Sequence, residues 1–213
     1  MGAKISIIII LATITNMGLF KIIKKEKFQI GIWQITETVD DLKKIANNLF
    51  AIKHKNINRV KETLINNILV NKLLPGAKIN YNNYGAPFLE NKFISISHTK
   101  KIACVIISDY KVGIDIEEIS NRPLQLANKF VCNKNKVLLT EKKAVIIWCF
   151  KEAIFKWYEK GNISFKKDII VNNFKTNEKG IVKAKFKNKM ISGKFIQIKN
   201  HYLVYLCKKK INL

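Results

Sequence analysis

The sequence predicts an α+β fold with antiparallel sheets in two halves of the chain. Three observations support this prediction. A β-prone segment and two helical segments come first, a close group of apolar runs lies near the middle, and a long helical segment is followed by more apolar runs. Helices and strands are thus grouped in blocks along the chain, which is typical of the α+β class.

The first half contains one expected strand and two expected helices. Residues 28–35 are apolar and β-prone. Apolar residues at helical spacing predict a helix over 37–50 that Thr38 caps. A second and stronger helical pattern covers 58–74 and stops at Pro75-Gly76.

Strands dominate the rest of the chain. We expect them at 93–97, 102–108, 112–117, 169–171, 181–186, 194–198 and 202–207. A short helix is expected over 124–130 and a long one over 141–158, with Gly161 in the capping position after the long helix.

The first sixteen residues imitate targeting signals without completing one. The apolar stretch at 5–11 is too short for a membrane-spanning helix, which needs about 20 residues. A signal peptide would need a convincing cleavage site, and the myristoylation-like start at Gly2 is a weak motif. We therefore expect Met17 to be the true start, 1–16 to be a non-native extension, and the protein to be cytoplasmic.

Charge alone does not identify the function. The 213 residues carry a formal net charge of +24, and such a field attracts polyanions. However, Arg59 and Arg122 are the only arginines, while Lys, Asn and Ile are over-used, as in proteins from AT-rich genomes. A dedicated phosphate-binding face usually carries more arginine, because the planar guanidinium grips phosphate with two hydrogen bonds. The four cysteines lack C-x-x-C spacing, which favours free thiols in a reducing compartment.

Two acidic residues in the predicted strand 112–117 are the first candidates for chemistry. Asp115 and Glu117 are two positions apart, so both side chains leave the same face, while Ile114 and Ile116 take the buried face. Neighbouring carboxylates repel each other, and a hard cation such as Mg²⁺ relieves that repulsion. The alternative is a surface strand with two solvated acids.

Further candidates lie on the long helix and at a strand end. Glu152 and Lys156 are four residues apart and share one helix face, either as a proton acceptor with a phosphate clamp or as a plain ion pair. His98 follows Ser97 at the end of a strand, where a histidine with a neighbouring hydroxyl can hold a phosphate. The alternative for a lone histidine is a structural role.

Taken together, the order and spacing of these signals resemble the signature of the 4′-phosphopantetheinyl transferase superfamily. The matching segments are Gly85-Ala86-Pro87, 93–98, 112–117, and 148–156 with Lys151-Glu152-Ala153 inside it. The chain length is similar to that of the two-lobed, surfactin-synthetase-activating type rather than the short trimeric type.

The resemblance implies two pseudo-twofold-related α/β lobes, 17–108 and 109–213, with coenzyme A bound in the cleft between them. It implies an enzyme that moves the phosphopantetheine arm of coenzyme A to a serine of an acyl or peptidyl carrier protein and releases 3′,5′-ADP. Such a holo-[acyl-carrier-protein] synthase serves fatty acid biosynthesis. Coenzyme A and an acidic apo carrier protein are the expected partners; we expect a monomer, with no nucleic acid or membrane partner.

The resemblance also implies roles for the acidic residues and the helix lysine. Asp115 and Glu117 would hold Mg²⁺, with Mn²⁺ as the alternative, against the pyrophosphate of coenzyme A. Glu152 would complete the metal shell or act as the base. Lys156 would stabilise charge on the pyrophosphate.

Other residues are expected to contact coenzyme A. His98 would contact the 3′-phosphate, next to Ser97, and Lys151 is a further phosphate contact. In the N-terminal lobe we expect Arg59 to bind phosphate, followed by the lysines of the same region, whose alternative is a solvated surface: Lys53, Lys55 and Lys61. Many relatives carry an acidic S-x-x-E stretch where this chain reads Cys-Asn-Lys-Asn at 132–135, so the preferred carrier is not predicted.

Two rival interpretations are kept. A basic nucleic-acid-binding protein would interleave aromatic and basic residues on one surface and would bind in a salt-sensitive way. A non-catalytic coenzyme-A-binding member of the same fold would bind the substrate without turnover.

Overall fold

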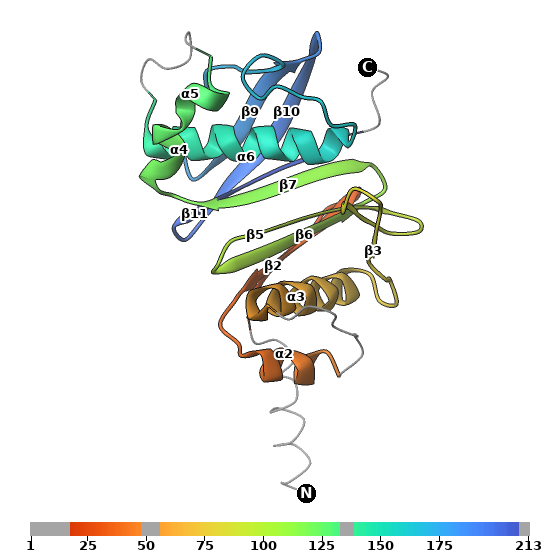
Figure 1. Ribbon diagram of the computed structural model, residues 1–213. Helices are drawn as coiled ribbons and strands as arrows, with labels where there is room; N and C mark the ends of the chain where they lie inside the picture. The colour runs from red at the N-terminus through yellow and green to blue at the C-terminus, as the bar shows by residue number, and fades with distance from the viewer. Residues whose placement is uncertain (1–17, 48–55, 133–138, 209–213) are drawn as a thin grey trace, which may run out of the picture.

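The computed structural model describes residues 18–47, 56–132 and 139–208 (Figure 1). The expected extension 1–16, the end of the first predicted helix at 48–50, Lys53, Lys55 and most of the 132–135 stretch lie outside the described residues.

The N-terminal half forms a four-stranded antiparallel sheet in the order β1-β2-β6-β5. Its strands are β1 (Leu19–Lys24), β2 (Phe28–Gln34), β5 (Phe93–His98) and β6 (Ile102–Ser108). A small separate pair joins β3 (Asn80–Tyr81) to β4 (Pro87–Phe88) around the turn at 82–86. The strands expected at 28–35, 93–97 and 102–108 are confirmed, whereas β1 was not predicted.

The C-terminal half forms a five-stranded antiparallel sheet in the order β7-β11-β10-β9-β8. Its strands are β7 (Lys111–Glu118), β8 (Ile169–Val171), β9 (Lys179–Phe186), β10 (Lys189–Ile198) and β11 (His201–Lys208). All were expected, although β10 begins five residues before the predicted Lys194. The alternation of buried and exposed residues in β9 explains why it could be predicted.

The helices agree closely with the predictions. They are α2 (Val39–Ile45), α3 (Ile57–Leu73), α4 (Asn121–Gln125), α5 (Ala127–Phe130) and α6 (Glu141–Tyr158). Thr38 caps α2 as predicted, in a capping box with Asp41. The predicted bounds of α6 are confirmed, but the predicted cap was wrong: Glu159, at φ 63°, takes the left-handed capping position that was assigned to Gly161. The single helix expected over 124–130 is two short helices.

The elements stack in four layers, with the two sheets facing each other and one long helix on each outer side (Figure 1). Three apolar clusters fill the spaces between layers. One lies between α3 and the first sheet, and one between α6 and the second sheet. The third joins the sheets through residues such as Ile32, Cys104, Ile114 and Leu203.

The two halves share one chain topology. In the first, β2 precedes α3 and then pairs with β6, which pairs with β5. In the second, β7 precedes α6 and then pairs with β11, which pairs with β10. The predicted α+β class is confirmed, and the shared order agrees with two related lobes. The lobe boundary at 108–109 stays a prediction. No described helix is long and apolar enough to cross a membrane.

Candidate active site

The two acidic residues of β7 face the long helix α6, as the period of a strand requires. Ile114 and Ile116 point into the cluster between the sheets. Asp115 and Glu117 point the other way and bond to side chains of α6. The predicted common face is confirmed, but it is not a solvated surface, because Asp115 is only 5% exposed.

Gly113 brings strand and helix together. A Cβ atom at Gly113 would lie 1.9 Å from the carbonyl oxygen of Ala153 in α6. Only glycine leaves room for so close an approach of two backbones. The consequence is that Asp115 lies in contact with Lys156 and close enough to Glu152 to act on its charge.

Asp115 is held by two donors. Ser97 Oγ donates to Asp115 Oδ1 at 2.7 Å, and Lys156 Nζ donates to the same oxygen at 2.8 Å. Lys156 Nζ also donates to the carbonyl oxygen of Ile114 at 3.1 Å. Burial opposes the charge of Lys156, but the attraction to Asp115, the hydrogen bond to it and the charge of Glu152 act together to raise the pKa of the ammonium. Lys156 is therefore a fixed cation.

Glu117 and Glu152 are carboxyls whose ionisation is disfavoured. Burial, followed by repulsion from Asp115, raises the pKa of Glu117. Burial and the charge of Asp115 raise the pKa of Glu152 to about 7, although Lys156 acts in the opposite direction. The site thus contains the cation of Lys156 and the three acidic residues Asp115, Glu117 and Glu152. The negative charges of the three acidic residues repel one another.

The carboxylate oxygens of the site are the type of ligand that a hard cation binds. Asp115 Oδ2 is buried and has no hydrogen-bond partner among the described residues, and carboxylate oxygens are the ligands that Mg²⁺ prefers. A divalent cation would relieve the repulsion that raises both glutamate pKa values. However, no group of three or more potential ligand side chains in the described part of the chain is arranged as a metal site. The metal assignment therefore stays a proposal.

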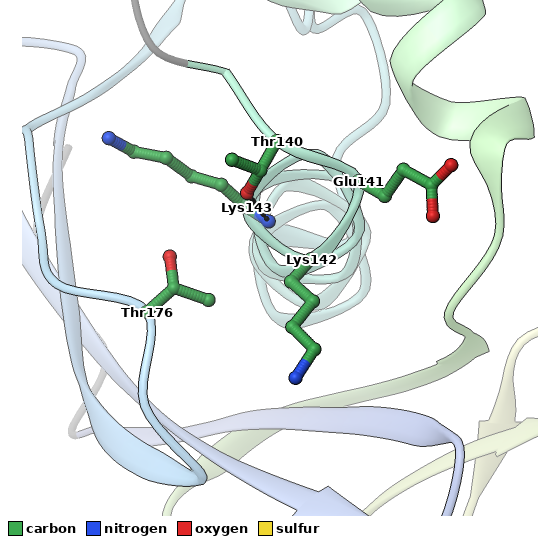
Figure 2. A pocket seen from close by; sticks show the side chains of 5 residues that line it. All are labelled: Thr140, Glu141, Lys142, Lys143 and Thr176. Carbon is green, nitrogen blue, oxygen red and sulfur yellow. Dashed lines mark hydrogen bonds between the residues drawn. The ribbon is translucent and has the colours of Figure 1, made fainter.

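A cavity of about 800 Å³ opens beside Lys156. The turn at 84–87 and the β5 residues 94–96 form one side, and the C-terminal end of α6 with the segment after it forms the other. Elements from both halves of the chain thus line it, with Phe155 and Lys160 next to Lys156. A second hollow of about 550 Å³ lies at the opposite, N-terminal end of α6, around Thr140 and Lys142 (Figure 2).

The residues expected to bind phosphate lie in different parts of the structure and have different partners. His98 Nε2 lies 3.2 Å from Glu62 Oε2 of α3, and Arg59 is exposed in the first turn of that helix. Lys61 Nζ donates to the Glu37 carbonyl oxygen at 2.6 Å. Ser97 is buried, and its hydroxyl also accepts from the Ile116 backbone N–H at 3.3 Å. Its contact with coenzyme A stays a prediction.

Lys151 lies inside the protein. Its ammonium donates to the backbone carbonyl oxygens of Phe165 and Ile169, and its residue is 2% exposed. Burial lowers its pKa to about 8. In this position Lys151 ties α6 to the first residue of β8 and to the segment before that strand, whereas it was expected to contact phosphate.

Lys151→Met is expected to destabilise the fold by about 3 kcal/mol, because two buried carbonyl groups lose a charged donor. The free energy of unfolding, measured with urea, checks this. Lys142→Met, an exposed change on the same helix, should be within about 0.5 kcal/mol of wild type. Equal stability of the two variants would contradict the buried role of Lys151.

No role was predicted from the sequence for two residues that contact the predicted site residues, Glu62 and Trp148. Glu62, the partner of His98, lies 36 positions earlier in a different element, so no local pattern could pair them. Trp148 stood inside the motif, but the hydrogen bond from its indole Nε1 to Glu117 Oε1, at 3.3 Å, spans 31 residues.

The fold and the site define a two-sheet α+β protein with an acidic site between a strand and a helix. Residues 111–207 match the family model of the 4′-phosphopantetheinyl transferase superfamily. The "4'-phosphopantetheinyl transferase gsp" of Aneurinibacillus migulanus is 28% identical over 127 residues, which are 52% of this chain and 53% of that protein. The match thus spans about half the length of this relative. The resemblance to the superfamily is confirmed, and the matched segment contains Asp115, Glu117, Glu152 and Lys156.

Proposed function

We propose that the protein is a 4′-phosphopantetheinyl transferase that moves the phosphopantetheine arm of coenzyme A to a serine of an apo carrier protein. The observation that carries this proposal is the Lys156–Asp115 pair, with two glutamates of raised pKa beside it, in the segment that matches the superfamily. We further propose that the protein acts as a holo-[acyl-carrier-protein] synthase and that it is a cytoplasmic monomer.

The positive charge of Lys156 serves the pyrophosphate. The serine oxygen attacks the β-phosphorus of coenzyme A, and the bond to the bridging oxygen breaks, so that 3′,5′-ADP leaves with the electron pair. Negative charge moves toward the leaving group as this bond breaks. Lys156, which borders the cavity and has a raised pKa, stays charged and stabilises that leaving group.

Glu152 takes the proton of the attacking serine. A serine hydroxyl is a weak nucleophile at neutral pH and needs a base whose pKa is near the working pH. In the metal-free protein the pKa of Glu152 is raised to about 7, which is near the working pH. Asp115, Glu117 and Glu152 would also hold Mg²⁺ or Mn²⁺, which would supply Lewis-acid stabilisation of the pyrophosphate when bound.

The 3′-phosphate of coenzyme A is assigned to the side of the molecule that carries His98 and Arg59. His98 lies at the end of β5, next to the first turns of α3 through its contact with Glu62. A phosphate at this place would compete with Glu62 for the imidazole. Ser97, Lys55 and Lys151 remain assigned only through the resemblance.

Glu152→Gln is expected to remove a pH dependence of stability in the metal-free protein. Between pH values of about 4.5 and 7 the folded state keeps a proton on Glu152 that the unfolded state has released. Wild type should therefore lose stability as the pH rises through this window, on the order of 2 kcal/mol, and level off above it. Glu152→Gln should lose the part of this slope that Glu152 causes and keep only the part that comes from the raised pKa of Glu117. Urea unfolding with a chelator present measures both curves, and parallel curves would contradict the raised pKa.

The release of 3′,5′-ADP tests the proposed function. The protein is mixed with coenzyme A, Mg²⁺ and apo carrier proteins of the fatty-acid, polyketide and peptide-synthetase types. Chromatography should show 3′,5′-ADP with at least one carrier, and none with the same carrier after its acceptor serine is changed to alanine. Binding of coenzyme A without release on any carrier would favour the non-catalytic alternative. Salt-sensitive binding of nucleic acid without release would favour the other rival.

A further inference from the structure

Trp148 touches the site through a single polar contact. It lies on α6 one turn before Glu152, and its indole Nε1 donates to Glu117 Oε1 at 3.3 Å. An indole has one donor and no acceptor, so this contact uses its whole hydrogen-bonding capacity. Burial and the negative charge of Asp115 both act on Glu117 and raise its pKa.

Two aromatic rings hold the indole in place. Phe130 packs edge-on against Trp148 with 5.1 Å between ring centroids, and Phe165 does so at 5.7 Å. Phe165 is itself tied down, because its backbone carbonyl accepts from the buried ammonium of Lys151. Edge-to-face contacts define the orientation of the rings as well as their distance. The N–H of Trp148 is therefore aimed at Glu117 by residues from three separate segments.

This contact restricts the carboxylate of Glu117. The last torsion of a glutamate side chain is broad, so a free carboxylate samples many directions. A donor fixed on Oε1 limits that rotation and so determines where Oε2 points. Outer-shell donors of this kind orient ligating carboxylates in metal sites.

Packing alone does not explain a tryptophan at this position. Trp157 lies nine residues later on the same helix, is 2% exposed, and its Nε1 has no hydrogen-bond partner among the described residues. Phenylalanine at 148 would keep the ring contacts with Phe130 and Phe165. What it would lose is the donor to Glu117.

We propose that Trp148 is a positioning residue that orients Glu117 toward a divalent cation, with Phe130 and Phe165 holding its indole. The inference rests on the metal assignment within the proposed function. It predicts that removal of the indole N–H weakens cation binding in the absence of coenzyme A and carrier protein. This effect is separate from any effect on transfer.

Binding of Mn²⁺, followed by the electron paramagnetic resonance signal of the free ion, tests the inference on the full chain. Trp148→Phe should bind Mn²⁺ about tenfold more weakly than wild type. The matched control Trp157→Phe removes an N–H from the same helix and should bind like wild type. Phe165→Leu, which loosens the indole without touching Glu117, should lie between them. Urea unfolding shows that each variant is folded before titration.

A double-mutant cycle with Glu117→Gln separates orientation from general loss of structure. If Trp148 acts through Glu117, Trp148→Phe should add little once the carboxylate is gone. Equal Mn²⁺ affinity of wild type and Trp148→Phe, or additive losses in the cycle, would overturn the inference. Absence of Mn²⁺ binding by wild type would overturn it together with the metal assignment. Tight Mn²⁺ binding with the predicted losses but no 3′,5′-ADP release would support the inference and contradict the proposed function.

Discussion

Asp115→Asn is expected to lower the rate of phosphopantetheine transfer at least about a hundredfold while the chain stays folded. Asparagine has nearly the same shape, and its carbonyl oxygen can still accept from Ser97 and Lys156. What disappears is the negative charge that pairs with Lys156 and that would hold a cation. The oxygen Oδ2, which is buried without a partner among the described residues, becomes an amide nitrogen that cannot ligate a metal.

The choice of asparagine rather than alanine matters for the reading of this experiment. Alanine would remove the acceptor oxygen together with the charge and would leave Ser97 Oγ and Lys156 Nζ without their shared partner, so a loss of rate could follow from loss of structure. Asp40→Asn, on the exposed first turn of α2, is the control for the chemical change. Initial rates are compared after unfolding curves establish that all variants are folded. A full rate in Asp115→Asn would contradict the role of Asp115.

Gly113→Ala is expected to destabilise the fold by about 3 kcal/mol or more. The new methyl group would lie 1.9 Å from the Ala153 carbonyl oxygen, and a backbone atom of α6 cannot swing aside as a side chain can. The helix must therefore move away from β7 and draw Lys156 away from Asp115. Transfer activity should fall together with stability.

Gly31→Ala is the matched control for the Gly113 variant. Gly31 also lies inside a strand, β2, but the nearest atom to its added Cβ is the end of the Leu69 side chain at 2.9 Å. That side chain can rotate, so the loss in the free energy of unfolding should be clearly smaller. If urea unfolding gave the two variants equal stability, the close packing of β7 on α6 would not be a requirement of the fold.

Local patterns were sufficient to predict most elements and the common face of Asp115 and Glu117. The period of a strand depends on neighbouring residues alone, and β7 and α6 have clear apolar patterns. Strand β1 escaped prediction because it is an edge strand with lysines along it, which is how edge strands avoid aggregation. The predicted cap of α6 was wrong because a glutamate adopts the left-handed conformation in place of the nearby glycine.

Contacts between distant segments could not be predicted from the sequence. The Ser97–Asp115 bond depends on how β5 lies against β7, and the Glu62–His98 contact depends on where α3 packs. Lys151 and Glu152 are neighbours in sequence, yet Lys151 bonds to β8 and the segment before it, while the pKa of Glu152 responds to burial and to Asp115. The pKa of Glu152 is raised mainly because its carboxyl is buried, and the sequence motif alone does not indicate that burial.

Transfer to a carrier serine is tested most directly by the intact mass of an apo carrier protein after incubation with the enzyme, coenzyme A and Mg²⁺. We predict that the carrier gains the mass of one phosphopantetheine group on its acceptor serine. The gain should be lost when the metal is chelated and should be strongly reduced with Asp115→Asn. Unchanged mass for every class of carrier tested, with folded wild-type enzyme, would contradict the proposed function.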